Sequence, residues 1–134
     1  MKKARLTTLY LTLALVASIL SLTACGPKAT QLGENDNGKQ VTLQVGESLT
    51  ISLPGNPSTG YSWEVKSVDT TLLEQKGEAQ FESSNTGLVG AGGTLILTFE
   101  TLKAGSTTLE LVYLRPWESD VEPLQTYSVE ITVK

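Results

Sequence analysis

Apolar and polar residues alternate in short segments along the chain from position 41 onward. Val41, Leu43 and Val45, for example, are separated by Thr42 and Gln44. A period of two places the apolar side chains on one face of a β-strand, whereas an α-helix repeats about every 3.6 residues. The same pattern recurs at positions 49–53, 61–65, 95–99, 109–113 and 127–133. The alternation therefore predicts a series of short strands that each bury one face.

Turn sequences that contain glycine separate these predicted strands at positions 46–47 and 103–106. Leu72-Leu73 and Phe81 mark two shorter strands in a less regular stretch. The result is about seven or eight strands at the spacing expected of an all-β sandwich. We therefore predict an all-β, immunoglobulin-like β-sandwich of antiparallel strands over residues 40–134, with a β-barrel as the second choice.

The start of the chain has the organisation of an export signal. A basic segment, Met1 to Arg5, precedes an apolar run from about Leu9 to Leu22, which is short for a bilayer-spanning helix of about 20 apolar residues. The run ends in Leu22-Thr23-Ala24-Cys25, which resembles the cleavage motif of bacterial lipoproteins. We predict that residues 1–24 are removed and that Cys25 is lipidated, which would anchor the protein to the outer side of a bacterial membrane. The alternative is an ordinary cleavable signal peptide and an unmodified Cys25.

Residues 26–39 are polar, rich in Gly and Asn, and without apolar periodicity. Such a segment cannot bury enough apolar surface to fold, so we predict a flexible tether between the lipidated Cys25 and the domain. Cys25 is also the only cysteine of the chain. The domain must therefore be stable without an internal disulfide.

Charge and composition exclude several functions. Loss of Lys2, Lys3 and Arg5 with the signal leaves 7 basic residues against 14 acidic ones, a formal net charge of −7. Such a domain lacks the clustered Lys and Arg that nucleic-acid phosphates require. The chain has no histidine, which is the commonest general base and metal ligand. We therefore predict no enzymatic activity, no metal, no cofactor and no nucleic-acid partner.

The first candidate binding segment is Asn56-Pro57-Ser58-Thr59-Gly60-Tyr61, which lies between two predicted strands. Pro57 fixes its own φ and favours extended geometry at Asn56, while Gly60 permits a positive φ. The hydroxyl side chains at positions 58 and 59 can bond to nearby backbone and stiffen the loop. An ordinary strand-to-strand turn would have the same features.

A glycine-rich segment, Gly90-Ala91-Gly92-Gly93, completes a second loop that begins near Ser83. Gly-rich loops can cradle phosphates, but only beside a helix N-terminus or a P-loop lysine, and here a predicted strand follows. A backbone without side chains can instead lie against another protein and hydrogen-bond to it. A mobile connection between strands is the alternative.

The third segment, Arg115-Pro116-Trp117, directly follows an apolar strand. Pro116 cannot donate a ladder hydrogen bond, so the chain should turn outward and place Trp117 at a loop tip. An exposed Trp beside an Arg is typical of an interaction hot spot. The alternative is a tryptophan that folds back to cap the sandwich.

Together and in this order, the three segments resemble the signature loops of the chagasin family, which inhibits papain-like cysteine proteases. The family patterns are Asn-Pro-Thr-Thr-Gly-Tyr, Gly-X-Gly-Gly and Arg-Pro-Trp, and the chain differs only by serine at position 58. The resemblance covers residues 38–134. It implies an inhibitor that binds reversibly and non-covalently, and we expect the chain to be monomeric. Its first loop would block the catalytic cysteine, the second would lie on the non-primed side of the groove, and Trp117 would pack on the primed side.

Two other functions remain open at this point. One is a cell-envelope adhesion or carbohydrate-binding module that uses Tyr61, Trp63 and Trp117 as stacking platforms, although the spacing of two between Tyr61 and Trp63 favours core positions. The other is a structural envelope lipoprotein whose three loops only make turns.

Overall fold

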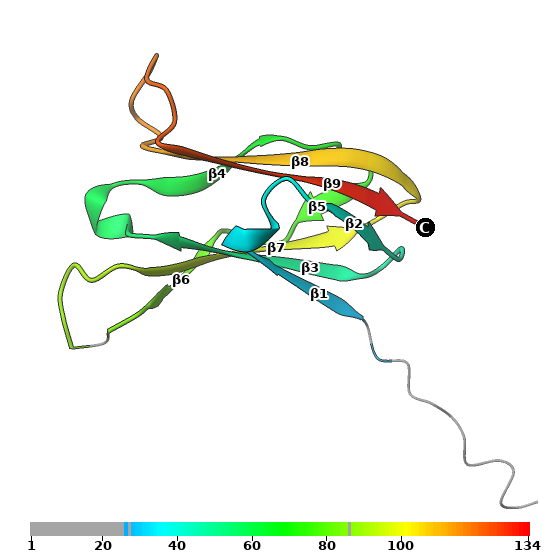
Figure 1. The fold of residues 1–134 in the computed structure, drawn as a ribbon, viewed down its shortest axis with the longest axis horizontal. Helices are drawn as coiled ribbons and strands as arrows, with labels where there is room; N and C mark the ends of the chain where they lie inside the picture. The colour runs from blue at the N-terminus through cyan, green and yellow to red at the C-terminus, as the bar shows by residue number, and fades with distance from the viewer. Residues whose placement is uncertain (1–25, 27, 86) are drawn as a thin grey trace, which may run out of the picture.

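In the part of the chain that the structure describes, nine strands form two β-sheets that pack face to face (Figure 1). The structure is a computed structural model and describes residues 26, 28–85 and 87–134. One sheet contains β1 (Ala29–Gly33), β3 (Ser48–Gly55), β5 (Leu73–Gln75), β6 (Gln80–Ser83) and β7 (Gly93–Thr101). The other contains β2 (Gln40–Leu43), β4 (Ser62–Ser67), β8 (Gly105–Leu114) and β9 (Gln125–Val133). The predicted all-β sandwich is confirmed.

Two pairs of neighbouring strands are parallel, although antiparallel strands were predicted. The order is β1-β3-β7-β5 in the first sheet, with β6 also paired to β7, and β2-β9-β8-β4 in the second. Most neighbours are antiparallel, but β1 runs parallel to β3 and β2 runs parallel to β9. The expectation of an entirely antiparallel sandwich is wrong for these two pairs. Neither pair is joined by a hairpin, because β2 of the other sheet separates β1 from β3 in the chain and six strands separate β2 from β9, so neither pair has to be antiparallel.

The inward faces of both sheets form one apolar core. Leu49, Ile51 and Leu53 of β3 lie opposite apolar residues of β7 in register and are buried. The second sheet contributes the buried residues of β8 and β9: Leu109, Leu111, Tyr113, Tyr127, Val129, Ile131 and Val133. Full burial of one such side chain stabilises the fold by about 1.5–3 kcal/mol, so this core holds the sheets together.

The N-terminal boundary of the domain is a correction to the sequence prediction. Residues 29–36, expected to belong to a flexible tether, form β1 and the short 3-10 helix η1 (Glu34–Asp36). Parallel pairing with β3 supplies the backbone hydrogen bonds of β1, and Leu32 packs against the core. The folded domain therefore begins at Ala29. The predicted signal peptide and Cys25 lie outside the described residues.

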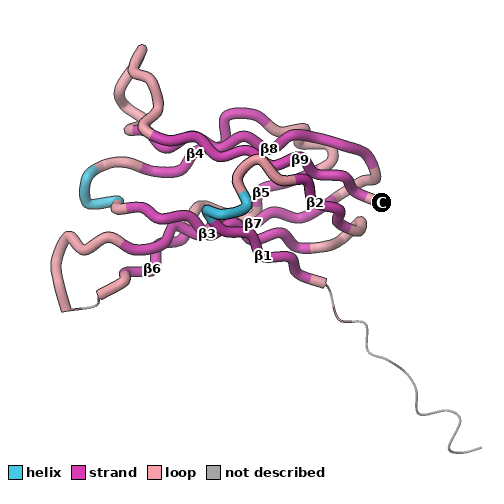
Figure 2. The backbone as a smooth tube through the Cα atoms, in the orientation of Figure 1, coloured by secondary structure: helices cyan, strands magenta, loops and turns pink. Residues whose placement is uncertain are grey.

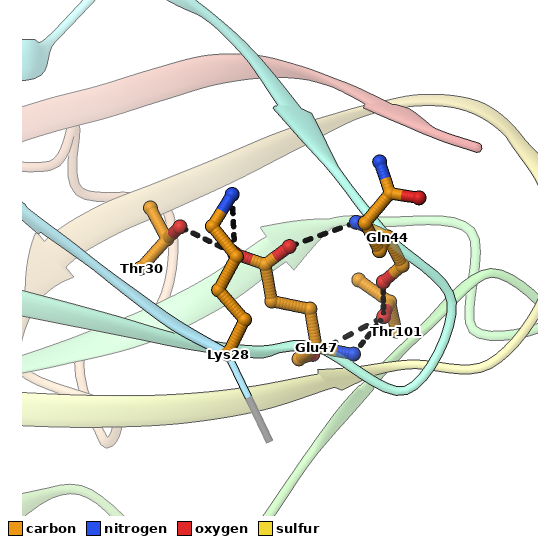
Figure 3. A network of polar contacts seen from close by, with 5 residues as sticks. All are labelled: Lys28, Thr30, Gln44, Glu47 and Thr101. Carbon is orange, nitrogen blue, oxygen red and sulfur yellow. Dashed lines mark hydrogen bonds and ion pairs between the residues drawn. The ribbon is translucent and has the colours of Figure 1, made fainter. Parts of the chain in front are cut away.

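A buried carboxylate attaches β1 to the rest of the sandwich (Figure 3). The Glu47 side chain is 1% exposed and accepts hydrogen bonds from Thr30 Oγ1 at 2.6 Å and from the Gln44 backbone N–H at 2.8 Å. Lys28 Nζ lies 3.9 Å from the same carboxylate. Burial disfavours the charged form, but the hydrogen bonds and Lys28 outweigh it and hold the pKa of Glu47 below its ordinary value. The network therefore fixes β1 with a charged, fully bonded side chain.

The two ends of the sandwich carry different connections. The β3–β4, β6–β7 and β8–β9 connections leave one end, whereas the described chain begins and Lys134 lies at the other end (Figure 2). Within residues 28–85 and 87–134, no group of three or more His, Cys, Asp or Glu side chains is placed to hold a metal ion. The same residues contain no helix that is long and apolar enough to cross a membrane.

Candidate functional site

The three segments singled out from the sequence lie at one end of the sandwich, where three connections emerge (Figure 1). The first loop (residues 56–61) joins β3 to β4, the second loop (residues 84–92) joins β6 to β7, and the third loop (residues 115–124) follows β8. Gly93, the last residue of the predicted glycine-rich segment, is the first residue of β7. The fold thus brings together three segments that are far apart in sequence.

Two side chains connect these loops directly. Asn56 Nδ2 donates a hydrogen bond to the Gly90 carbonyl oxygen at 3.0 Å, which links the first loop to the second. Arg115 Nε donates to the Thr59 carbonyl oxygen at 3.0 Å, which links the third loop to the first. The first loop is therefore the centre of a continuous edge, with the other two attached on either side.

The first loop is also stabilised internally by its own side chains. Asn56 precedes the 3-10 helix η2 (Pro57–Thr59), and its Oδ1 accepts hydrogen bonds from the Ser58 N–H at 3.1 Å and the Ser58 hydroxyl at 2.6 Å. Thr59 Oγ1 donates to the Asn56 carbonyl at 2.6 Å. Gly60 ends η2 with a φ of +83°, a conformation that glycine adopts without strain. The loop is preorganised before any partner binds.

An aromatic cluster under the first loop ties it to the core. The Tyr113 hydroxyl accepts a hydrogen bond from the Asn56 N–H at 3.0 Å. The Tyr113 ring lies 5.3 Å from the Tyr61 ring and 5.2 Å from the Trp63 ring. Trp63 is buried, as its strand position predicts, and its Nε1–H donates to the Pro54 carbonyl at 3.0 Å. These rings support the loop, so Trp63 and the half-buried Tyr61 are not exposed stacking platforms for a glycan.

The partly exposed Arg115 side chain contacts other residues of the loops. Its guanidinium carbon lies 4.6 Å from the centre of the Tyr61 ring, a cation–π arrangement. Nη1 also pairs with Glu118 Oε1 at 3.1 Å. Together with the bond to Thr59, these contacts use the side chain to hold the third loop in place. The sequence predicted that Arg115 contacts a partner, and the structure shows that its guanidinium contacts Thr59, Tyr61 and Glu118 of this chain.

Trp117 is 68% exposed, so it does not cap the sandwich. Its ring nevertheless lies against Gly60, because a Cβ atom added there would overlap the indole carbons. The position of Gly60 therefore requires glycine for two reasons, the positive φ and the contact with Trp117. The indole rests on the first loop and presents most of its surface outward.

The second loop exposes two apolar side chains that the sequence analysis did not select. Leu88 is 65% exposed and Val89 is 108% exposed, and both immediately precede Gly90. Ser84 closes the base of the loop through hydrogen bonds from its N–H at 3.1 Å and its hydroxyl at 2.5 Å to the Gly92 carbonyl. The sequence does contain an indication of this exposure: Leu88 and Val89 are adjacent apolar residues in an otherwise polar, glycine-rich loop and belong to no alternating segment.

Three loops joined through the first one, with exposed apolar side chains, make this end of the β-sandwich a candidate surface for binding another protein. The family model described as "Chagasin family peptidase inhibitor I42" matches residues 42–131 of the chain. The protein belongs to this family, whose members are inhibitors of cysteine proteases and not enzymes. The resemblance noted from the three motifs is therefore confirmed.

Relatives of similar length support the assignment. Amoebiasin-2 from Entamoeba histolytica is 34% identical over 102 residues, which cover 75% of this chain and 83% of that protein. Chagasin from Trypanosoma cruzi is 32% identical over 99 residues, which cover 69% of this chain and 87% of chagasin.

Solved structures show the same fold. The cysteine protease inhibitor EhICP2 from Entamoeba histolytica superposes with a TM-score of 0.71 at 28% identity, covering 81% of this chain and all of that one (100%). PbICP-C, solved in complex with falcipain-2, has a TM-score of 0.56 at 22% identity and covers 80% of this chain and 99% of its own. The second likeness concerns the fold alone. Both agree with the immunoglobulin-like sandwich predicted from the strand pattern.

Proposed function

We propose that this protein inhibits papain-like cysteine proteases by inserting its three loops into the active-site groove. The observation that carries the proposal is the bracing of the loops by Asn56 and Arg115 into one continuous edge. A preorganised edge loses little conformational entropy when it binds, which allows tight, reversible and non-covalent association. Membership of the chagasin family, together with the likeness to the cysteine protease inhibitor EhICP2, supports a cysteine protease as the partner.

Each loop has a proposed place in the groove, taken from the family resemblance. The first loop lies at the catalytic cysteine, where η2 presents Ser58 and Thr59 in a helical turn instead of an extended scissile peptide. The second loop lies along the non-primed side with Gly90–Gly93 in backbone contact, and Leu88 and Val89 extend this contact with apolar surface. The third loop places the exposed face of Trp117 on the primed side.

Inhibition assays with soluble residues 26–134 test the proposal against papain. Thr59→Arg places a bulky charged side chain at the centre of the edge, where we expect inhibition to weaken about hundredfold or more. Thr108→Arg, on an exposed face of β8, is the matched control and should inhibit like the parent chain. No inhibition by the parent chain at micromolar concentration would overturn the proposed function.

Trp117→Ala tests the third loop separately. Loss of an exposed hot-spot ring should weaken inhibition by about 1–3 kcal/mol, with the melting temperature nearly unchanged because the indole is largely outside the core. A lower melting temperature with unchanged inhibition would assign Trp117 a purely structural role.

The proposed location of the inhibitor is the outer side of a bacterial membrane, held there by lipid on Cys25. This proposal rests on the export signal and on the position of the chain's only cysteine directly after Leu22-Thr23-Ala24. Labelled palmitate fed to an expressing bacterium should appear in the protein, and the variant Cys25→Ser should lose the label. An unlabelled parent chain would favour the ordinary signal peptide.

A further inference from the structure

Four segments meet at the end of the sandwich opposite the loops, and we call them the anchor end: Lys28, residues 44–47, residues 102–104 and Lys134. Backbone hydrogen bonds hold them together. The Ser48 N–H donates to the Lys28 carbonyl at 3.1 Å, and the Val45 N–H donates to the Lys134 carbonyl at 3.1 Å. The Gly46 N–H donates to the Thr101 carbonyl at 2.9 Å, directly before the third segment. The anchor end is therefore one surface.

The chain enters the domain at this surface along a fixed path. Lys28 is bound at its carbonyl by Ser48, and its ammonium group faces the Glu47 carboxylate (Figure 3). Thr30, two residues further, donates to the same carboxylate. The entering segment is thus attached from Lys28 onward instead of swinging freely, so its direction is set by the sandwich.

This attachment leaves little chain between Cys25 and the domain. Four Cα–Cα steps join Cys25 to Ala29, the first residue of β1, and they span at most about 14 Å. A lipid on Cys25 would therefore bring the anchor end to the headgroup region. A flexible tether from residue 26 to residue 39, as the sequence predicted, would have allowed a much larger separation.

The anchor end has side chains suited to a headgroup surface. Val45 is 51% exposed and Leu102 is 43% exposed, which is apolar surface on turn residues. Lys28, Lys103 and Lys134 are exposed around them, and long lysine side chains can bury their stems while the ammonium groups contact phosphates. Carboxylates at the same end offset these lysines: Glu47 is charged and faces Lys28, and Asp69 lies close enough to Lys103 to interact with it. Glu74 and Glu100, one residue from this end of β5 and β7, share Lys76.

The loop end is acidic, whereas charges of the two signs nearly balance at the anchor end. Glu82, Glu118, Asp120 and Glu122 are exposed at or beside the second and third loops, while the basic side chain there, Arg115, is already paired with Glu118. A domain with one acidic end and one nearly neutral end that exposes lysines is oriented by a negative membrane surface. The acidic end is repelled, so the anchor end faces the surface, where its exposed lysines can reach the headgroups.

We infer that the anchor end rests on the anionic phospholipid headgroups of the membrane, so that the three loops point away from the bilayer. The inference rests on the proposed lipid anchor. β8 has 10 residues and runs the length of the sandwich, so the loops would stand about 30 Å above the surface, open to a protease arriving from solution.

Lysine footprinting on the lipidated chain tests this orientation. The protein is reconstituted in vesicles of phosphatidylglycerol and phosphatidylethanolamine, floated, and acylated with a membrane-impermeant amine reagent, and each lysine is read by mass spectrometry. We expect Lys28, Lys103 and Lys134 to react about fivefold more slowly than in soluble residues 26–134, which corresponds to about 1 kcal/mol per lysine at an anionic surface. Lys39 and Lys66 are internal controls and should react equally in both states.

Two further measurements assign the protection to the anionic surface. Vesicles of phosphatidylcholine, or salt near 1 M, where the Debye length is about 3 Å, should restore most of the reactivity while the protein still floats. The double variant Lys103→Glu, Lys134→Glu should raise the reactivity of Lys28 on anionic vesicles, whereas Lys66→Glu should not. Equal reactivity of the three anchor-end lysines on floated vesicles and in solution would overturn the inference.

Failure of the lipid anchor itself is recognised separately, because an unlipidated chain does not float. In that case residues 25–134 are coupled through the Cys25 thiol to a maleimide lipid, and the same footprinting is performed. Protection of the three lysines then supports the orientation without the natural lipid, and uniform reactivity contradicts it.

Discussion

Glu47 and Asn56 organise opposite ends of the sandwich by the same kind of contact. Each side chain accepts a hydrogen bond from a nearby backbone N–H, that of Gln44 at 2.8 Å or that of Ser58 at 3.1 Å. Each also binds a segment far away in sequence, Thr30 for Glu47 and Gly90 for Asn56. The Glu47 side chain is 1% exposed, however, whereas the side-chain bonds of Asn56 lie at the surface.

Burial decides what each network does. A buried donor or acceptor that loses its partner retains the full cost of desolvation, so the Glu47 network should determine the stability of the domain. At the surface, water replaces a lost partner, so the Asn56 network should affect stability little and determine mainly where the loops lie. The comparison predicts that stability and inhibition respond to different residues.

The largest effect on stability should come from Glu47→Ala. It leaves the Gln44 N–H and the Thr30 hydroxyl without their buried acceptor, and we expect the free energy of unfolding to fall by about 2–4 kcal/mol. Urea unfolding of residues 26–134 measures this change. Glu110→Gln, which removes an exposed ion pair with Lys66, is the control and should change stability by less than about 0.5 kcal/mol. Similar losses in both variants would show that burial does not distinguish the two carboxylates.

The Glu47 network should also make the free energy of unfolding depend on pH. The pKa of Glu47 is lower in the folded protein than its ordinary value, so its contribution is present above the ordinary pKa and is lost as the pH falls through the folded value. The stability difference between the parent chain and Glu47→Gln should therefore be constant between about pH 5 and pH 7 and shrink below about pH 4. Urea unfolding at several pH values tests this. A difference that grows in acid would contradict the assignment.

Asn56→Asp should separate inhibition from stability at the other end. The carboxylate still accepts from the Ser58 N–H, but it cannot donate to the Gly90 carbonyl. We expect an unfolding free energy within about 0.5 kcal/mol of the parent chain. Inhibition of papain should weaken about tenfold because the second loop is released. Asn56→Ala, which loses all three side-chain bonds, should weaken inhibition as well and lower stability by about 1 kcal/mol, less than Glu47→Ala. Equal inhibition by Asn56→Asp and the parent chain would show that the link to Gly90 does not position the loop.

The smallest effect, and the sharpest control, concerns Gly60→Ala. Alanine is strained at a φ of +83°, and its Cβ would also push Trp117 aside. Gly38 has a φ of +79° with open space around it, so Gly38→Ala isolates the backbone strain. Both variants should lose about 1 kcal/mol of stability, and Gly60→Ala alone should weaken inhibition. Equal inhibition by the two variants would mean that the position of Trp117 is not important for binding.

The sequence predicts the strands and turns that are determined by residues close together in the chain. The long strands β3, β7, β8 and β9 follow from alternation because each buries one face. The bends at Pro57 and Gly60 follow from the restricted or permissive φ of those residues. β1 was not predicted because the contacts that fix it come from residues distant in the sequence. The Glu47 carboxylate that binds Thr30 lies 17 residues further along the chain, and Leu32 is the only large apolar residue of β1.

The candidate site was predictable only in its parts. Three motifs identify the segments, but the bond from Arg115 to Thr59 joins residues 56 positions apart, and no local pattern indicates that the arginine contacts the first loop. Leu88 and Val89 were not predicted as site residues. Their exposure depends on how the second loop leaves the sheet, which the sequence alone does not determine.

The parallel pairing of β1 with β3 has a mechanical consequence. A pull on the N-terminal end of β1 acts along the strand, so its hydrogen bonds to β3 resist the force together in shear rather than opening one after another. Because the chain continues through η1 into β2 of the other sheet, the same force is shared by both layers. If a protease bound at the loops pulled the domain away from its N-terminal attachment, the β1–β3 hydrogen bonds would have to break together, and β1 would not separate from β3 one bond at a time.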